Sequence, residues 1–122
     1  MPRLLLCLAP WTLAACGAGA AESTCSTEPV SAGCNADLSE RGCEAEGGCW
    51  GTWGLSDQAS CNCQTADDGQ PCTSNADCDG VCVAPQAECE TAVQGTCSSL
   101  ERVYGCYCAP NGDGSWSTLC AD

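Results

Sequence analysis

Cysteine constrains the fold of this chain more than any other residue type, because 16 of its 122 residues are cysteines. A fraction of about 13% exceeds the roughly 8–10% that marks a disulfide scaffold in a short exported chain. Cys7 and Cys16 lie near the amino terminus, and the remaining cysteines are even in number. We therefore predict seven bridges and no leftover thiol. The residues predicted to be bridged are Cys25, Cys34, Cys43, Cys49, Cys61, Cys63, Cys72, Cys78, Cys82, Cys89, Cys97, Cys106, Cys108 and Cys120.

The large apolar residues that usually build a core are scarce. The chain has no Phe and one Met, and Val and Leu are few beyond the first fifteen residues. Hydrophobic burial alone would struggle to offset the conformational entropy that folding removes. Each bridge stabilises by about 2–4 kcal/mol, so several bridges can replace the missing core. We predict a small disulfide-rich fold, dominated by loops, with short β-hairpins and short helices.

Residues 1–15 have the pattern of a signal peptide. Arg3 gives a positive start, and an apolar stretch of about a dozen residues follows it. This stretch is too short to span a bilayer, which takes roughly twenty apolar residues. We therefore expect the chain to be exported into a compartment where disulfides persist.

The signal peptide ends in Leu-Ala-Ala-Cys-Gly at residues 13–17, which resembles the lipobox of bacterial lipoproteins. The resemblance implies cleavage before Cys16, a lipid on its sulfur, and residues 16–24 as a flexible tether to a membrane. Gly17 after the cysteine favours the outer membrane by the family's sorting rule. The alternative is cleavage after Ala20, which would release a secreted protein.

The charge of the chain is strongly acidic. It has 16 Asp and Glu residues and no His, and its three basic residues are Arg3, Arg41 and Arg102. Nucleic-acid binding is disfavoured because neutralising phosphates needs Lys or Arg. Catalysis is disfavoured as well, since His and Lys are absent and the cysteines are expected to be oxidised. The acidity is compatible with solubility alone, or with attraction of cations or basic partners.

The cysteine-rich domain is predicted to span residues 25–122, and two stretches in it are similar. Residues 43–72 and 89–120 each contain Cys-Glu, a small spacer, Gly-x-Cys, a Cys-x-Cys and a closing Cys. This indicates two related units, although chance alignment is a real alternative in so Cys-rich a chain. Five cysteines per unit would require pairing outside the unit.

Local patterns predict a hairpin and two helices. Residues 104–109 alternate as a strand, residues 110–114 favour a turn, and residues 115–120 can return as its partner. Short helices are expected over residues 36–46 and 86–94, each with acidic residues early in the run. The two residues of a Cys-x-Cys cannot comfortably bridge each other, so each pair should reach two different partners.

One segment resembles half of a calcium loop. Asn75, Asp77 and Asp79 place oxygens at alternate positions, and Gly80 follows at the sharp turn. Gln86 stands where the bidentate Glu should be, so the alternative is a set of Asx turns. We predict no other cofactor.

Two tryptophans, Trp50 and Trp53, are flanked by small residues that would leave their rings accessible. They are candidates for stacking on a sugar or a peptide, although packing against disulfides would use the same rings. The expected partners are therefore the membrane, through the lipid, and an envelope protein or glycan.

The Cys-x5-Cys-x3-Cys segment formed by Cys72, Cys78 and Cys82 resembles modules of small Cys-rich bacterial lipoproteins, which bring no established activity. A weaker similarity links residues 106–120 to thyroglobulin type-1 modules, some of which inhibit cysteine proteases, with Tyr107 and Ala109 where that motif has Trp and Val. We therefore predict a non-enzymatic binding or structural lipoprotein of the envelope. A protease inhibitor and a calcium-binding module are the alternatives.

Overall fold

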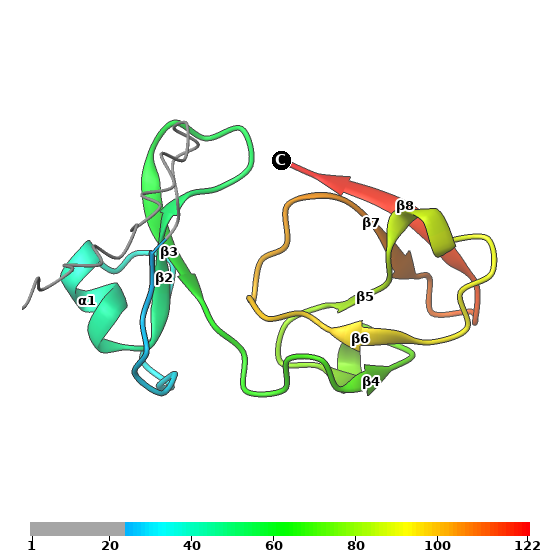
Figure 1. Ribbon diagram of the computed structural model, residues 1–122, viewed down its shortest axis with the longest axis horizontal. Helices are drawn as coiled ribbons and strands as arrows, with labels where there is room; N and C mark the ends of the chain where they lie inside the picture. Colours follow the sequence, from blue (N-terminus) through cyan, green and yellow to red (C-terminus); the bar gives the residue numbers. More distant parts are fainter. Residues whose placement is uncertain (1–23) are drawn as a thin grey trace, which may run out of the picture.

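The structure is a computed structural model that describes residues 24–122, so the predicted signal peptide and Cys16 lie outside the described residues. Short strands dominate it (Figure 1). They form one sheet in the order β1-β2-β3, a second in the order β4-β6-β5, and a two-stranded sheet of β7 and β8. The elements are β1 (Thr24–Cys25), α1 (Glu40–Ala45), β2 (Gly48–Thr52), β3 (Ala59–Cys63), β4 (Pro71–Cys72), the 3-10 helix η1 (Asn75–Asp77), β5 (Cys82–Val83), the 3-10 helix η2 (Gln86–Glu88), β6 (Gly95–Cys97), β7 (Gly105–Pro110) and β8 (Trp116–Ala121).

The seven predicted bridges are present, and they divide into two groups. Three bridges join residues within 25–63, and four join residues within 72–120; among the described residues none crosses from one group to the other. We call residues 24–63 the amino-terminal module and residues 71–122 the carboxy-terminal module. The pairs are Cys25–Cys49, Cys34–Cys63 and Cys43–Cys61 in the first module, and Cys72–Cys82, Cys78–Cys97, Cys89–Cys108 and Cys106–Cys120 in the second.

The core of the described chain consists of cystine. Within residues 24–122, the buried hydrophobic residues are eight cysteines and Ala84. One cluster gathers Cys43, Cys61 and Cys63, and a second gathers Cys72, Cys82 and Cys97. A tryptophan packs against each cluster, Trp50 in the first and Trp116 in the second. The bridges therefore supply both the cross-links and most of the buried apolar surface.

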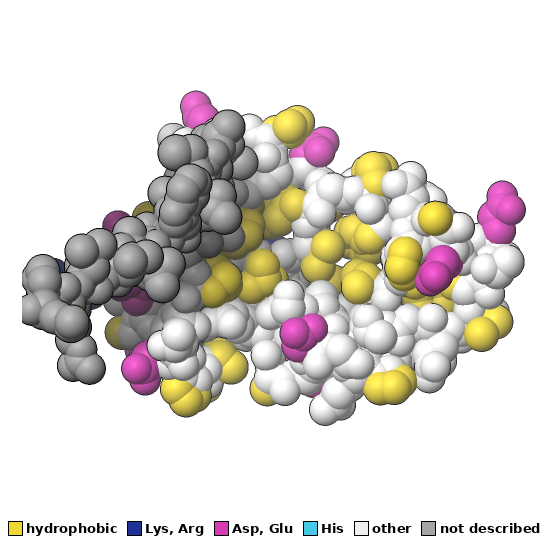
Figure 2. All heavy atoms as spheres, viewed as in Figure 1, with side chains coloured by type: hydrophobic (Ala, Val, Ile, Leu, Met, Phe, Trp, Pro, Cys, Tyr) yellow, Lys and Arg dark blue, Asp and Glu magenta, His cyan; other side chains and the backbone are white. Residues whose placement is uncertain are grey.

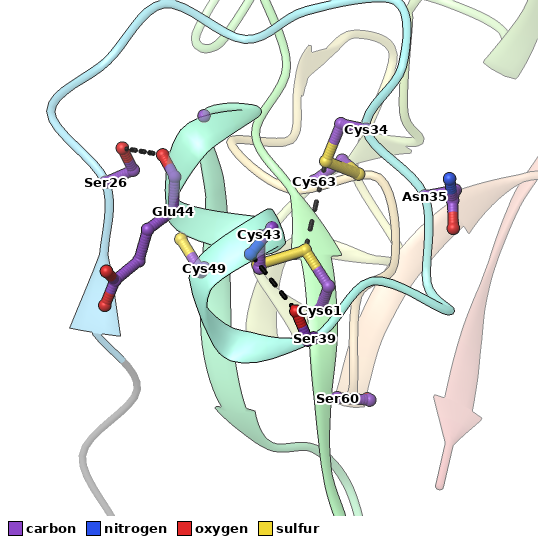
Figure 3. Close-up of a disulfide and its surroundings, with 12 residues drawn as sticks. Ser26, Cys34, Asn35, Ser39, Cys43, Glu44, Cys49, Ser60, Cys61 and Cys63 are labelled. Carbon is purple, nitrogen blue, oxygen red and sulfur yellow. Dashed lines mark hydrogen bonds between the residues drawn. A yellow bond between two sulfur atoms is a disulfide. The ribbon is translucent and has the colours of Figure 1, made fainter.

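The amino-terminal module forms around two bridges that lie beside each other (Figure 3). The Sγ atoms of Cys34 and Cys61, which belong to different bridges, are 3.9 Å apart. A Cβ added to Gly48 would lie 2.5 Å from the Sγ of Cys61 and 2.7 Å from that of Cys43. Only glycine leaves room for the sulfurs at this point of β2.

Helix α1 begins later than the predicted run of residues 36–46. Ser39 is its N-cap, and its hydroxyl accepts a hydrogen bond from the backbone N–H of Gly42 at 3.3 Å. Just before it, the side-chain oxygen of Asn35 accepts from the N–H of Asp37 at 3.0 Å and forms an Asx turn. Such turns compete with helix, so the helix starts only after this turn.

The second predicted helix, over residues 86–94, is wrong in length. Only η2 forms there, and a turn follows it. Cys89 is bound to Cys108 on β7, and the chain must turn back within a few residues to enter β6 at Gly95. The tertiary cross-link ends the helix.

The predicted hairpin is confirmed. β7 and β8 pair antiparallel from Gly105 opposite Ala121 to Pro110 opposite Trp116. Asp113 organises the turn, because its carboxylate accepts from the backbone N–H of Ser115 at 2.9 Å. Hydrogen bonds of 3.0 Å in both directions between Ala84 and Cys108 attach β7 to the rest of the module.

Each Cys-x-Cys reaches two different partners, as predicted. The pairing inside the two similar stretches differs, however. In residues 43–72, Cys43 bonds the first cysteine of the Cys-x-Cys, Cys61; in residues 89–120, Cys89 bonds the second, Cys108. The cross-links therefore add no support to a duplication, which stays a prediction from the sequence.

Candidate functional site: the seam between the modules

The middle residue of the first Cys-x-Cys joins the two modules. Asn62 is fully buried between Cys61 and Cys63, whose sulfurs are bridged within the amino-terminal module. Its amide donates to the carbonyl of Arg102 at 2.8 Å and accepts from the N–H of Arg102 at 3.1 Å. Side chains alternate along a strand, so the cysteines hold one face of β3 while Asn62 faces the other module.

Residues 98–102 run beside the end of β3 and complete this contact, which we call the seam. The N–H of Glu101 donates to the carbonyl of Cys63 at 2.9 Å, and the N–H of Thr65 donates to that of Ser99 at 3.0 Å. The Arg102 guanidinium donates to the carbonyl of Cys61 at 2.5 Å. One of the few cations of the chain is thus used to hold the modules together.

An aromatic groove opens along the seam. It has a volume of about 290 Å³ and is lined by Trp53 from the first module and by Ser99, Leu100, Arg102, Val103 and Tyr104 from the second. The rings of Trp53 and Tyr104 stack, with their centroids 6.4 Å apart and an angle of 18° between their planes. The indole N–H donates to the carbonyl of Ser60 at 3.0 Å, which fixes the orientation of the ring. We call this the seam groove.

The chain just after Trp53 approaches the end of the second module. Leu55 follows Trp53 by two residues in sequence and is 83% exposed. A Cβ added to Gly54 would lie 2.6 Å from the backbone of Asp122 and 2.8 Å from the ring of Tyr104. The end of the second module therefore packs closely beside the groove. Figure 2 shows hydrophobic side chains gathered near the middle of one face, with acidic side chains spread around them.

The two candidate tryptophans take different positions. Trp50 is opposite Cys61 in the β2–β3 ladder and, itself partly buried, packs against the first cystine cluster. Trp53 is partly exposed and lies in the seam groove. Sequence inspection found Trp53 but missed Tyr104, Leu100 and Val103, because only the folded chain brings them to it. Arg102 offered a signal, since a basic residue is rare in this chain.

The oxygens of the calcium-like segment hold the loop's own backbone. Asn75 accepts from the N–H of Cys82 at 2.9 Å, and Asp77 accepts from the N–H groups of Thr73 at 3.0 Å and Ser74 at 3.2 Å. The hydrogen bonds from Thr73 and Ser74 lower the pKa of Asp77. These are turn and capping contacts, while calcium ligation by Asn75, Asp77 and Asp79 stays a prediction.

The described residues contain three groups of side chains that could offer ligand atoms to a metal. Within each group the ligand atoms lie within 4.8 Å of one another, and every group contains cysteines. Their sulfurs belong to disulfides, so they offer no thiolate to a metal. Asp67 belongs to the group with Cys78 and Cys97. Its Oδ2 accepts from the N–H of Asp79 at 2.8 Å.

Residues 106–120, which resemble a thyroglobulin type-1 module, lie in the β7–β8 hairpin, and protease inhibition stays a prediction. The chain matches no protein-family model, no curated protein and no solved structure. Within residues 24–122, the helices are all too short or too polar to cross a membrane.

Proposed function

We propose that the chain is a non-enzymatic binding lipoprotein of a bacterial envelope, which holds a basic segment of a partner protein in the seam groove. The observation that carries the binding proposal is the Trp53–Tyr104 pair, which lines a groove on a strongly acidic chain. Aromatic anchors in such pockets contribute much of the energy of protein recognition. A cystine framework holds both walls, so little conformational entropy is lost on binding.

The overall charge favours a basic partner, and Arg102, which lines the groove, already donates its guanidinium to the carbonyl of Cys61. The formal net charge of the whole chain is −13. Glu101 is exposed and is adjacent in sequence to the groove residues Leu100 and Arg102. Asp122 is also exposed, and its backbone lies beside Gly54, the residue after Trp53. A Lys- or Arg-rich segment would be attracted to this surface and steered toward it. Its apolar side chains would then contact the rings of Trp53 and Tyr104.

The lipid anchor has its own test in the native host. Cys16→Ser removes the predicted lipidation site, whereas Cys7→Ser, a matched change inside the predicted signal peptide, leaves it intact. We expect the wild type and Cys7→Ser in the membrane fraction, with a mass equal to residues 16–122 plus acyl groups. Cys16→Ser should leave that fraction. An unlipidated wild-type mass that begins near Ala21 would contradict the anchor.

The groove is tested by titrating the full chain with a synthetic peptide of alternating lysine and leucine. A peptide with glutamate in place of lysine is the control, and the readouts are calorimetry and tryptophan emission. We expect binding of the basic peptide, weakened about tenfold or more by Trp53→Ala, the typical effect of removing a hot spot. Val93→Ala, which trims a side chain that is 82% exposed, should leave the affinity unchanged.

A second variant separates binding from folding. Val103→Lys keeps Trp53 in place and adds a cation to the groove, so it should weaken the basic peptide without lowering the melting temperature as Trp53→Ala could. Equal affinity for the wild type and both groove variants would mean general charge attraction and would contradict the proposal. Binding of an envelope oligosaccharide in place of the peptide would contradict it too.

A further inference from the structure

One bridge differs from the other six in its exposure to solvent. Cys106 and Cys120 are both exposed, whereas every other bridge of the described chain contains at least one buried cysteine. Thiol–disulfide exchange requires a thiolate to approach a sulfur directly, so access decides which bridge reacts. Exposure therefore singles out Cys106–Cys120.

A second bridge provides a matched comparison. Cys25–Cys49 and Cys106–Cys120 each join directly opposite residues of two antiparallel strands. Their Cα atoms are 3.9 Å and 4.0 Å apart, respectively. The two bridges differ in burial, because Cys49 is fully buried in β2. Any difference in their reactivity can thus be assigned to burial, because the two bridges have the same kind of strand pairing and similar Cα distances.

Opening Cys106–Cys120 would be a local event. β7 would stay attached through the Cys89–Cys108 bridge and through the two backbone hydrogen bonds between Ala84 and Cys108. Cys108 is fully buried and lies two residues after Cys106 on β7. The end of β8 would lose its covalent link to β7 and keep its antiparallel pairing, while the cystine clusters of both modules would keep their cross-links.

We propose that Cys106–Cys120 is a thiol–disulfide exchange site whose co-reactant is a dithiol protein of the Cys-x-x-Cys type. A thiolate of the co-reactant attacks one of the two sulfurs, the bond between Cys106 and Cys120 breaks, and its electron pair leaves on the other sulfur. The second thiolate of the co-reactant then attacks the co-reactant's own sulfur in the mixed disulfide, and the bond between the two proteins breaks with its electron pair on the sulfur of this chain. Two electrons and two protons pass to this chain, which ends with two thiols, while the dithiol becomes a disulfide.

The test is a partial reduction of the full oxidised chain with reduced dithiothreitol, quenched at intervals with N-ethylmaleimide. After complete reduction and a second alkylation, cleavage at Arg102 separates residues 103–122 from the rest, and fragment ions assign each label. We expect the first two maleimide labels on Cys106 and Cys120. They should appear on the order of tenfold faster than labels on Cys25 and Cys49.

The double variant Cys106→Ser with Cys120→Ser should lose this first reduction step and keep the other six bridges. If that variant does not fold, the order in which the cysteines of the wild type are labelled still tests the proposal. Earlier or equally fast opening of Cys25–Cys49, or of a bridge with a buried sulfur, would overturn the proposal. Simultaneous appearance of all the thiols would overturn it as well.

Discussion

Each module holds two bridges in a buried cluster, and the modules differ in the bridge that joins directly opposite residues of two strands: Cys25–Cys49 contains a fully buried cysteine, whereas both cysteines of Cys106–Cys120 are exposed. The sulfurs of Cys34 and Cys61 are 3.9 Å apart in the first module. In the second, the cluster around Cys82 and Cys97 is buried, and the last bridge of the hairpin is exposed. The contribution of a bridge therefore depends on what packs against its sulfurs, as well as on the loop that it closes.

The largest expected effect comes from removing a central bridge and comparing it with the peripheral one. Cys43→Ala with Cys61→Ala takes away a cross-link whose cysteines are both fully buried, and leaves a cavity in the cluster. We expect the free energy of unfolding to fall by about 2–5 kcal/mol. The melting temperature of oxidised protein, followed by circular dichroism, measures the loss.

The control is Cys106→Ala with Cys120→Ala, which removes a bridge of similar loop length, 14 against 18 residues of separation. It leaves no cavity, since both cysteines are exposed. A smaller decrease in melting temperature is expected. Equal decreases would show that loop closure alone sets the value of a bridge here, and the comparison between modules would lose its basis.

The next effect tests the close packing inside each module. Gly48→Ala forces a methyl group against the sulfurs of the first cluster, and Gly95→Ala forces one to 2.5 Å from the carbonyl oxygen of Val83 and 2.9 Å from the ring of Trp116. Bridged sulfurs and strand backbone cannot easily move, so each variant should lose about 1–3 kcal/mol. Thermal unfolding with near-ultraviolet detection of the tryptophans measures it.

Gly33→Ala is the matched control in the first module. Its methyl group would meet the Glu46 carboxylate at 3.2 Å, and that carboxylate is the far end of a flexible side chain, which can rotate away. We expect little change in stability. A loss as large as that of Gly48→Ala would indicate that a general effect of alanine, rather than contact with the sulfurs, is responsible.

The seam is tested by Asn62→Ala. The change leaves the backbone N–H and carbonyl of Arg102 without their side-chain partners, and leaving buried polar groups unsatisfied costs about 1–3 kcal/mol. All seven bridges should still form, so mass spectrometry should find no free thiol. We expect faster proteolysis between the modules together with weaker peptide binding in the seam groove.

Asn35→Ala provides a comparison for the seam variant, because Asn35 is exposed and bonds only within its own turn. Proteolysis between the modules should stay at the wild-type rate. If Asn62→Ala also leaves proteolysis and peptide binding unchanged, the modules are held by residues other than Asn62.

The smallest expected effect is a change of stability at acidic pH, and it arises from two carboxylates of the second module. Hydrogen bonds from the backbone lower the pKa of Asp77, and those from Ser115 lower the pKa of Asp113. The folded pKa lies below the unfolded value of about 3.9, so the stabilisation is present above that value and is lost as the pH falls through the folded pKa. Asp77→Asn should therefore reduce the melting temperature slightly at pH 5 and by less at pH 2. A constant difference across this range would contradict a role for the ionised carboxylate.

The sequence predicted the features that follow from local composition and spacing. Its cysteine content and poverty in large apolar residues indicated a cystine core, and the alternation before the Gly-rich turn at residues 110–114 located the hairpin. The helix over residues 86–94 failed because a distant partner, Cys108, fixes Cys89. No local pattern carries that information.

The amino-acid sequence by itself determined that cross-links must hold this chain, because too few apolar side chains are present to offset the entropy of folding. Only the tertiary structure decided which cysteines pair, which tryptophans pack against the cystine clusters and which bridge faces solvent. Pairing depends on which Cα atoms approach within about 4–7 Å, and that distance is set by strand registers and turns acting together. For the same reason, Trp53 and Tyr104 become one groove only when Asn62 and Arg102 bring the modules together.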